Sequence, residues 1–269
     1  MPIHPTAIVE DGAQIGADVS IGPFCLVSSE AVLSDGVRLL SHVVVSGKTS
    51  IGARSVVHPH CALGGEAQIR GGVAPNARVT IGEDCVLREG VTVSCGSAKG
   101  GELTSIGHRT YLMANCHIGH DCHIGSDVTF SNGVLIAGHV EIADSVLIGG
   151  NSAVQQFSRI GRGAFLSGLS GVTLDIIPYG EAVGLHARHG GLNLIGLKRR
   201  GIPRARIHAL RAAYRLIFLE NDCSFAQSAK QALEKWPDMD EVREVAEFIL
   251  APAKRQIAPA RRRGATDED

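Results

Sequence analysis

An apolar residue returns at every sixth position along most of the first two thirds of the chain. The series is unbroken from Val9 to Leu63 and again from Ile106 to Val172, and nearly all of its members are branched aliphatics. A smaller residue lies two positions before each of them, and glycine often follows, as in Ile21-Gly22 and Ile118-Gly119. A period of six matches neither an alternating strand nor a helix. It indicates a repeat architecture of the solenoid type.

Three such hexads make one turn of a triangular coil with 18 residues. Each aliphatic side chain then points inward and stacks on its equivalent in the next coil, about 4.8 Å away, the usual separation of hydrogen-bonded strands. Glycine suits the corners, where unusual backbone angles are needed. The pattern therefore predicts an all-β parallel β-helix over residues 1–187.

Two stretches interrupt the repeat. Residues 64–78 lose the pattern between Gly64-Gly65-Glu66 and Pro75-Asn76 and predict an exposed loop. Between Val93 and Ile106 the spacing is thirteen, where two hexads would give twelve, and residues 94–104 predict a second loop. Long loops that leave a rigid solenoid often carry function.

The spacing becomes helical after about Arg188. Helices are predicted from Pro203 to Leu219, from Ser224 to Lys235 and from Asp240 to Leu250, with Ser224 as an N-cap. We therefore expect a helical domain over residues 188–251 and a disordered tail over residues 252–269.

Composition and charge narrow the class of protein. A net charge of -1 over 269 residues gives no general attraction to nucleic acid or to an anionic membrane. No apolar stretch of about 18 residues is present, so no membrane span is expected, and the first residues lack a signal-peptide pattern. Seven cysteines, an odd number, speak against a closed disulfide framework. We expect a cytoplasmic protein.

Polar residues gather along one edge of the predicted coil. His120 and Gly138 fall in one column of the 18-residue frame, His139 is next to Gly138, and Gln156 lies one coil further on. An imidazole with a neighbouring carboxylate, here Asp121, can act as a general base. A backbone N–H beside it, such as that of Gly138, can hold a developing oxyanion. The His120 side chain is expected at the surface.

A metal site is the competing interpretation of this region. His117, His120 and His123 look like a ligand cluster, and zinc needs three or four ligands that converge at about 2.0–2.1 Å for histidine nitrogen. However, His117 and His123 are six residues apart, which places them on different faces of the coil. The spacing disfavours a metal, and a non-catalytic or metal-binding β-helix of the carbonic-anhydrase-like kind stays as the alternative class.

Several segments resemble the UDP-N-acetylglucosamine acyltransferases that begin lipid A synthesis. They are Ile3-His4-Pro5-Thr6-Ala7-Ile8-Val9, Ile21-Gly22-Pro23-Phe24-Cys25, Ser41-His42-Val43-Val44-Val45, His117-Ile118-Gly119-His120-Asp121-Cys122, Ala137-Gly138-His139-Val140 and Gly196-Leu197-Lys198-Arg199-Arg200-Gly201. The resemblance covers nearly the whole chain. It implies a left-handed coil, a homotrimer whose sites are shared between adjacent subunits, and no organic cofactor or metal.

The resemblance also implies a reaction. His120 would remove the proton from the 3-hydroxyl of UDP-N-acetylglucosamine, Asp121 would orient His120, and the N–H of Gly138 would stabilise the oxyanion formed from an acyl thioester on acyl carrier protein. The other implied substrate-binding residues are His117 and His139 along the acyl and sugar sites, Gln155, Gln156, His186, Asn193 and Arg200 around the nucleotide sugar, Arg199 facing acyl carrier protein, and Gly168 at the position that sets acyl chain length.

The sequence departs from the family pattern at three places. Gln155 stands where histidine is common, Gln68-Ile69-Arg70-Gly71-Gly72 lacks the usual lysine, and Ile195 replaces an acidic residue near the uracil. N-acylation of a 3-amino analogue of the UDP sugar is therefore the alternative activity. The later N-acyltransferase of the same pathway fits less well, because it has an extra N-terminal domain and this chain begins its repeat almost at once.

Overall fold

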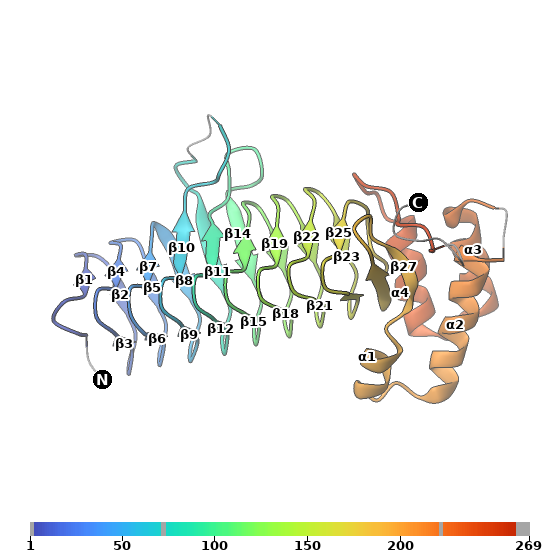
Figure 1. The fold of residues 1–269 in the computed structure, drawn as a ribbon, viewed down its shortest axis with the longest axis horizontal. Helices are drawn as coiled ribbons and strands as arrows, with labels where there is room; N and C mark the ends of the chain where they lie inside the picture. The colour runs from blue at the N-terminus through green and yellow to red at the C-terminus, as the bar shows by residue number, and fades with distance from the viewer. Residues whose placement is uncertain (1–2, 71–73, 221–222, 262–269) are drawn as a thin grey trace.

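The computed structural model describes residues 3–70, 74–220 and 223–261, and its first part is a long triangular prism (Figure 1). In the described residues, three sheets form the faces of the prism, and the chain visits them in turn. Their strands are parallel except for the last pair of the third sheet, which is antiparallel. Sheet A contains β1 (Ile8–Val9), β4 (Leu26–Val27), β7 (Val44–Val45), β10 (Ala62–Gly65), β13 (Thr92–Ser94), β16 (His117–Ile118), β19 (Leu135–Ile136), β22 (Ala153–Val154) and β25 (Gly171–Val172).

The other two faces follow the same order along the prism. Sheet B contains β2 (Gln14–Ile15), β5 (Val32–Leu33), β8 (Lys48–Ile51), β11 (Arg78–Ile81), β14 (Leu103–Ile106), β17 (His123–Ile124), β20 (Glu141–Ile142) and β23 (Arg159–Ile160). Sheet C contains β3 (Ser20–Ile21), β6 (Arg38–Leu39), β9 (Val56–Val57), β12 (Val86–Leu87), β15 (Tyr111–Leu112), β18 (Thr129–Phe130), β21 (Leu147–Ile148), β24 (Phe165–Leu166), β26 (Gly180–Val183) and β27 (Arg188–Leu192).

Register and burial agree with the six-residue pattern. Ile8 pairs with Leu26, and Thr129 pairs with Leu147, so most coils contain 18 residues. The second residue of each two-residue strand points inward, and Phe130 is the largest of these side chains that is fully buried. The predicted left-handed parallel β-helix followed by a helical region is confirmed.

The two loops are insertions between neighbouring faces. Arg78 pairs with Lys48, thirty residues earlier, and Leu103 pairs with Arg78, twenty-five residues earlier. The spacing of thirteen between Val93 and Ile106 therefore contains one hexad step and an inserted loop, as the break in the pattern predicted. The loops contact each other, since the N–H of Cys95 donates to the Gly65 carbonyl at 2.8 Å.

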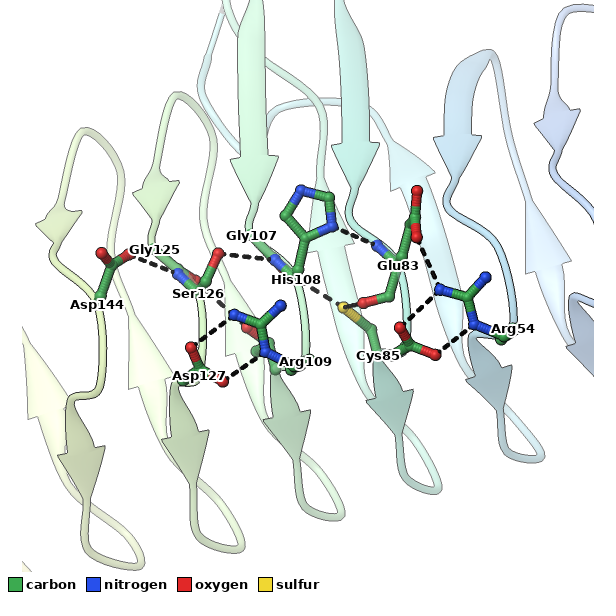
Figure 2. Close-up of polar contacts among 12 residues, drawn as sticks. Arg54, Glu83, Cys85, Gly107, His108, Arg109, Gly125, Ser126, Asp127 and Asp144 are labelled. Carbon is green, nitrogen blue, oxygen red and sulfur yellow. Dashed lines mark hydrogen bonds and ion pairs between the residues drawn. The ribbon is translucent and has the colours of Figure 1, made fainter. Parts of the chain in front are cut away.

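At the corner between sheets B and C, side chains of one coil accept N–H groups of the coil before it (Figure 2). Ser126 Oγ accepts from the N–H of His108 at 3.0 Å, and Asp144 Oδ1 accepts from the N–H of Ser126 at 2.8 Å. The Arg109–Asp127 ion pair lies on the same corner, with side chains 57% and 47% exposed. An exposed pair contributes only about 0–1 kcal/mol, so coil stacking depends mainly on the buried aliphatic columns.

Beyond β25 the described residues form the β26–β27 hairpin and four helices (Figure 1). The helices are α1 (Leu194–Arg199), α2 (Arg204–Phe218), α3 (Phe225–Lys235) and α4 (Asp240–Leu250). Three of them match the predicted ranges, and Ser224 caps α3 in a capping box. The expected domain boundary after residue 187 falls within the hairpin. Within the described part of the chain, no helix has the length and apolar character needed to span a membrane.

The expected disordered tail differs from the structure over residues 252–261, which we call the C-terminal segment. Ile257 forms a parallel bridge with Asp175 at the end of the β-helix, and Ala258 is buried. The prediction failed here because this segment has no periodic pattern of its own. Its pairing with a coil about 80 residues earlier cannot be seen in the sequence. The rest of the predicted tail, residues 262–269, lies outside the described residues.

Candidate active site

The corner between sheets A and B carries the candidate catalytic residues. His120 and Asp121 form the turn from β16 to β17, and Asp121 has a φ of 59°. Aspartate tolerates this left-handed conformation better than most residues. Thr104 of β14 fixes the turn, because its Oγ1 accepts the N–H of Asp121 at 2.9 Å.

His120 and Asp121 form a buried pair. The Nδ1 of His120 lies 2.7 Å from Oδ2 of Asp121, and the two side chains are 8% and 0% exposed. With Nδ1 facing the carboxylate, the other ring nitrogen, Nε2, is left for a substrate proton. This is the arrangement that general base catalysis requires.

Ser97 holds the same carboxylate from the second loop. Its N–H donates to Asp121 Oδ1 at 2.8 Å and its hydroxyl donates to Oδ2 at 2.6 Å. Gly100 also lies against the carboxyl, where an added Cβ would be 2.0 Å from Asp121 Cγ. The loop therefore closes over Asp121, and together with the ring of His139 it buries His120 to 6% exposure. The expectation that His120 lies at the surface is wrong for this reason.

The pKa of Asp121 lies below its ordinary value. Burial alone would raise this pKa, but the hydrogen bonds from Ser97 and His120 outweigh it. Asp121 is consequently a carboxylate at neutral pH.

Replacement of Ser97 by alanine should weaken catalysis and shift its pH dependence. Ser97 helps to depress the pKa of Asp121, so its removal raises that pKa, and activity on the acid side should be lost at a higher pH. A hydrogen bond to a charged group is worth about 1.5–3 kcal/mol, which corresponds to roughly a tenfold or larger fall in kcat. The measurement is the pH profile of kcat, with Ser97→Thr as the variant that should restore it. An acid limb at the native pH would contradict this role of Ser97.

Gly138 lies directly beneath the His120 ring, as the 18-residue frame predicts. A Cβ added to Gly138 would be 2.5 Å from Cε1 and 2.6 Å from Nε2 of His120. The next N–H, that of His139, donates to the His120 carbonyl at 2.9 Å. Among the described residues, no protein acceptor takes the N–H of Gly138. This N–H beside Nε2 is therefore available for an oxyanion.

His139 extends the row of rings along the same corner. Its ring meets His120 edge-on at 5.0 Å and stacks on Phe157 of the following coil at 4.6 Å. Burial lowers the pKa of His139; His120 and Lys254 add to the fall and Asp121 opposes it. Gln155 and Gln156 follow on this corner and are exposed. Ser97 and Lys254 were not singled out from the sequence, because the loop and the C-terminal segment have no periodic signal. Phe157 lies in the periodic coil and was also not singled out.

His117 and His123 lie on either side of the corner. His117 is half-buried on the outer face of sheet A, with Nδ1 2.8 Å from the hydroxyl of Thr92, and burial followed by the proximity of His120 lowers its pKa. His123 is exposed on sheet B, with Nδ1 2.9 Å from the hydroxyl of Ser105. These two rings do not converge with His120 on one metal site, in agreement with the spacing argument.

Another set of residues in this region has the composition of a metal site. His120, Asp121 and His139 place one ligand atom each within 4.8 Å of one another, as found in a search of the described residues. Two imidazoles and a carboxylate suit several transition metals. However, Nδ1 of His120 and Oδ2 of Asp121 are already hydrogen-bonded at 2.7 Å, so a metal would have to separate them.

The remaining predicted residues lie away from His120 in the same chain. Gly168 is at the corner between sheets C and A, and His186 is exposed in the turn between β26 and β27. Asn193 caps α1 by accepting the N–H of Gly196 and donates to the Gly163 carbonyl at 3.0 Å. These sites belong to other corners or to the far end of the prism.

Arg199 and Arg200 lie at the end of α1. Arg199 is exposed. The Arg200 guanidinium donates to the carbonyl of Gly163 at 3.4 Å and to that of Ser145 at 3.5 Å, both at the corner between sheets B and C. Burial lowers the pKa of Arg200. Asn193 and Arg200 therefore belong to the corner between sheets B and C, apart from the corner of His120 in the same chain.

Comparisons with known proteins identify related acyltransferases. A family profile described as Udp N-acetylglucosamine O-acyltransferase, domain 2, matches residues 175–258, and one described as bacterial transferase hexapeptide, six repeats, matches residues 103–138. The acyl-[acyl-carrier-protein]–UDP-N-acetylglucosamine O-acyltransferase of Rhizobium johnstonii is 43% identical, over 95% of this chain and 94% of its own length.

Two further relatives have the same description or fold. The enzyme of the same description from Bartonella henselae is 46% identical, over 94% of this chain and 92% of its own. The solved structure of UDP-N-acetylglucosamine acyltransferase from Campylobacter jejuni is 34% identical with a TM-score of 0.91, and the match covers 97% of this chain and 100% of that one. With such relatives across nearly its whole length, this chain belongs to the acyl-[acyl-carrier-protein]–UDP-N-acetylglucosamine O-acyltransferase family.

Proposed function

We propose that this chain transfers a 3-hydroxyacyl group from acyl carrier protein to the 3-hydroxyl of UDP-N-acetylglucosamine, the first step of lipid A biosynthesis. The observation that carries the proposal is the buried His120–Asp121 pair packed against the available N–H of Gly138, in a chain of this family. An oxygen nucleophile that attacks a thioester needs both a base and an oxyanion donor.

The residues divide the reaction between them. Asp121 accepts Nδ1–H of His120 and fixes the neutral tautomer, so Nε2 takes the proton of the sugar hydroxyl. The hydroxyl oxygen bonds to the thioester carbon, and the negative carbonyl oxygen is stabilised by the N–H of Gly138. The C–S bond then breaks, and the proton held by His120 passes to the departing thiolate. No cofactor enters this sequence.

The outer faces of the prism support a homotrimer. Outward residues of sheet A are largely apolar, and those of sheet C include Val56, Val86, Leu147 and Phe165. Leu135 and Leu147 remain 51% and 37% exposed in one chain. Outward residues of sheet B are largely polar, as at Ser105, His123 and Glu141. Exposed apolar faces mark association surfaces. Sheets A and C are therefore the proposed contacts, and sheet B is the proposed outer surface.

Such a trimer would complete the site. If sheet A of one subunit packs on sheet C of the next, the corner with His120 meets the neighbour's corner between sheets B and C. That corner carries Asn193 and Arg200, which supports their assignment to the nucleotide sugar held against His120 of the adjacent subunit. Gln156, His139 and the other substrate residues implied by the resemblance stay part of this proposal.

We also propose a basic docking surface for acyl carrier protein. Lys198 and Arg199 are exposed at the end of α1, which suits an acidic partner. Arg206 on the neighbouring helix α2 is instead paired with Asp240 and Glu241 on α4 at 2.6 and 2.8 Å. A cytoplasmic location is proposed as well and is supported by the seven cysteines, all in described positions and all unpaired.

Replacement of Gly168 by methionine should shorten the preferred acyl chain. A Cβ at Gly168 would meet the Gly150 carbonyl at 3.4 Å, an ordinary contact, so the side chain fits the fold and extends from the corner beside sheet A. A pocket shortened by a bulky group discriminates about 10–200-fold per methylene. Competition among acyl carrier proteins of different chain lengths measures this preference. An unchanged preference in the folded variant would remove Gly168 from the acyl site.

The proposed activity is tested with two acceptors in parallel. Hydroxyacyl carrier proteins of several lengths are supplied with UDP-N-acetylglucosamine and, separately, with its 3-amino analogue. The proposal expects transfer to the hydroxyl sugar. Transfer to the amine alone would keep the base and change the substrate, whereas transfer to neither would favour a non-catalytic β-helix.

A further inference from the structure

The C-terminal segment adds a rung to the corner that carries His120. The N–H of Asp175 donates to the Gln256 carbonyl at 2.8 Å, and the N–H of Ala258 donates to the Asp175 carbonyl at 2.9 Å. Arg255 Nε also donates to the carbonyl of Gln156 at 3.0 Å. The segment is thus fixed against the last coils of the β-helix, and its side chains have defined places beside the site.

Lys254 of this segment lies at the end of a row of rings formed by His120, His139 and Phe157. Its ammonium lies 4.1 Å from the centre of the Phe157 ring, whose plane stacks on His139 at 4.6 Å. His139 in turn meets His120 at 5.0 Å. The row therefore runs from the proposed base to an exposed cation, and each successive member lies one coil further along the prism.

The charge of Lys254 is not neutralised by any of the described residues. Among the described residues, no carboxylate lies within ion-pair distance of its ammonium, whereas Arg109, Arg159 and Arg206 are all paired with acids. Cation–π contact with Phe157 positions the ammonium without cancelling its charge. An exposed cation held at the end of this row of rings is suited to an anionic group of a substrate.

The distance between His120 and Lys254 indicates which anionic group of a substrate could reach both residues. His120 and Lys254 are separated by three steps between neighbouring coils, or roughly 14 Å at about 4.8 Å per step. In UDP-N-acetylglucosamine the diphosphate is attached to the same sugar ring as the reacting hydroxyl, which is too close. The pantetheine arm of acyl carrier protein has two amide units between sulfur and phosphate, comparable to about four extended residues, or at most ~14 Å.

We infer that Lys254 is a substrate-positioning residue that binds the phosphate of the carrier protein's pantetheine arm while the thioester lies at His120. The inference rests on the proposed acyl transfer. It places Lys254, and the part of the C-terminal segment that pairs with Asp175, in the donor site.

Lys254→Met tests the inference, because methionine keeps an apolar stem over Phe157 and removes the charge. KM for acyl carrier protein should rise about five- to tenfold, with kcat within about twofold and KM for UDP-N-acetylglucosamine unchanged. With an acyl-pantetheine donor that lacks the phosphate, variant and native chains should have equal kcat/KM. Lys254→Arg should restore the native KM. The matched control is Lys235→Met, which removes an exposed lysine 5.0 Å from the Trp236 ring.

Two results would overturn the assignment: an unchanged KM for acyl carrier protein, or a rise in KM for UDP-N-acetylglucosamine alone, which would assign Lys254 to the nucleotide. A binding measurement separates this question from turnover. Native chain should bind carrier protein with its pantetheine arm more tightly than carrier protein without it, and Lys254→Met should reduce that difference. This comparison remains decisive even if the native chain transfers no acyl group and the proposed function fails.

Discussion

His120→Ala is expected to lower kcat by about 10²–10⁴-fold, the usual contribution of general base catalysis. The side chain is the candidate base, with Nδ1 held by Asp121 at 2.7 Å and Nε2 over Gly138. Binding of UDP-N-acetylglucosamine should change much less than kcat, because a base acts mainly in the transition state. Steady-state kinetics with acyl carrier protein as donor, together with calorimetric binding of the sugar, measure both effects.

His123→Ala is the matched control for this variant. His123 lies three residues further on, is exposed on sheet B and contacts Ser105 of the same sheet. Its loss should therefore leave kcat near the native value. The fold of both variants is checked by thermal unfolding. Near-native turnover by folded His120→Ala would remove His120 from the mechanism.

Gly138→Ala is expected to cost about 10²-fold in kcat, since a displacement of about 1 Å at the reacting groups has an effect of this size. The added methyl would lie 2.5 Å from Cε1 of His120, which forces the ring to move. Overpacking of this kind also costs about 1–3 kcal/mol of stability. Kinetics and denaturant unfolding of the variant measure the two effects separately.

A double-mutant cycle shows whether the collision causes the loss. In the His120→Ala background the methyl at position 138 has room, so Gly138→Ala should cost much less stability there than in the native chain. Gly65→Ala is the control, because a Cβ at Gly65 would meet nothing within 4 Å. A native kcat for Gly138→Ala would mean that the close packing of Gly138 and His120 is not required.

The β-helix was predictable because its core is a local and repeated property of the sequence. The apolar position of each hexad predicts which side chain points inward. The 18-residue period then predicts which residues lie in one column along the prism, such as His120 and Gly138. The frame also showed where residues are inserted, but not what the inserted loops contact. The twelve residues between Val93 and Ile106 contain the predicted loop, and its hydrogen bonds to Asp121 could not be read from a spacing.

The candidate site was predictable only where the coil itself positions the residues. His120, Asp121, Gly138 and His139 follow from the frame, whereas Ser97 approaches from a loop 24 residues earlier. Lys254 comes from a segment that sequence reasoning expected to be disordered, yet it reaches Phe157 through backbone pairing with Asp175. Contacts of this kind depend on tertiary structure and produce no periodic pattern in the sequence.

The acyl position in the product tests the central claim most directly. Purified chain is supplied with a 3-hydroxyacyl carrier protein and UDP-N-acetylglucosamine, and the nucleotide-sugar product is examined by mass spectrometry and proton NMR. The account predicts one added acyl group, as an ester on the 3-oxygen of the sugar. Unmodified UDP-N-acetylglucosamine after prolonged incubation with active donor, or an acyl group at another position, would contradict it.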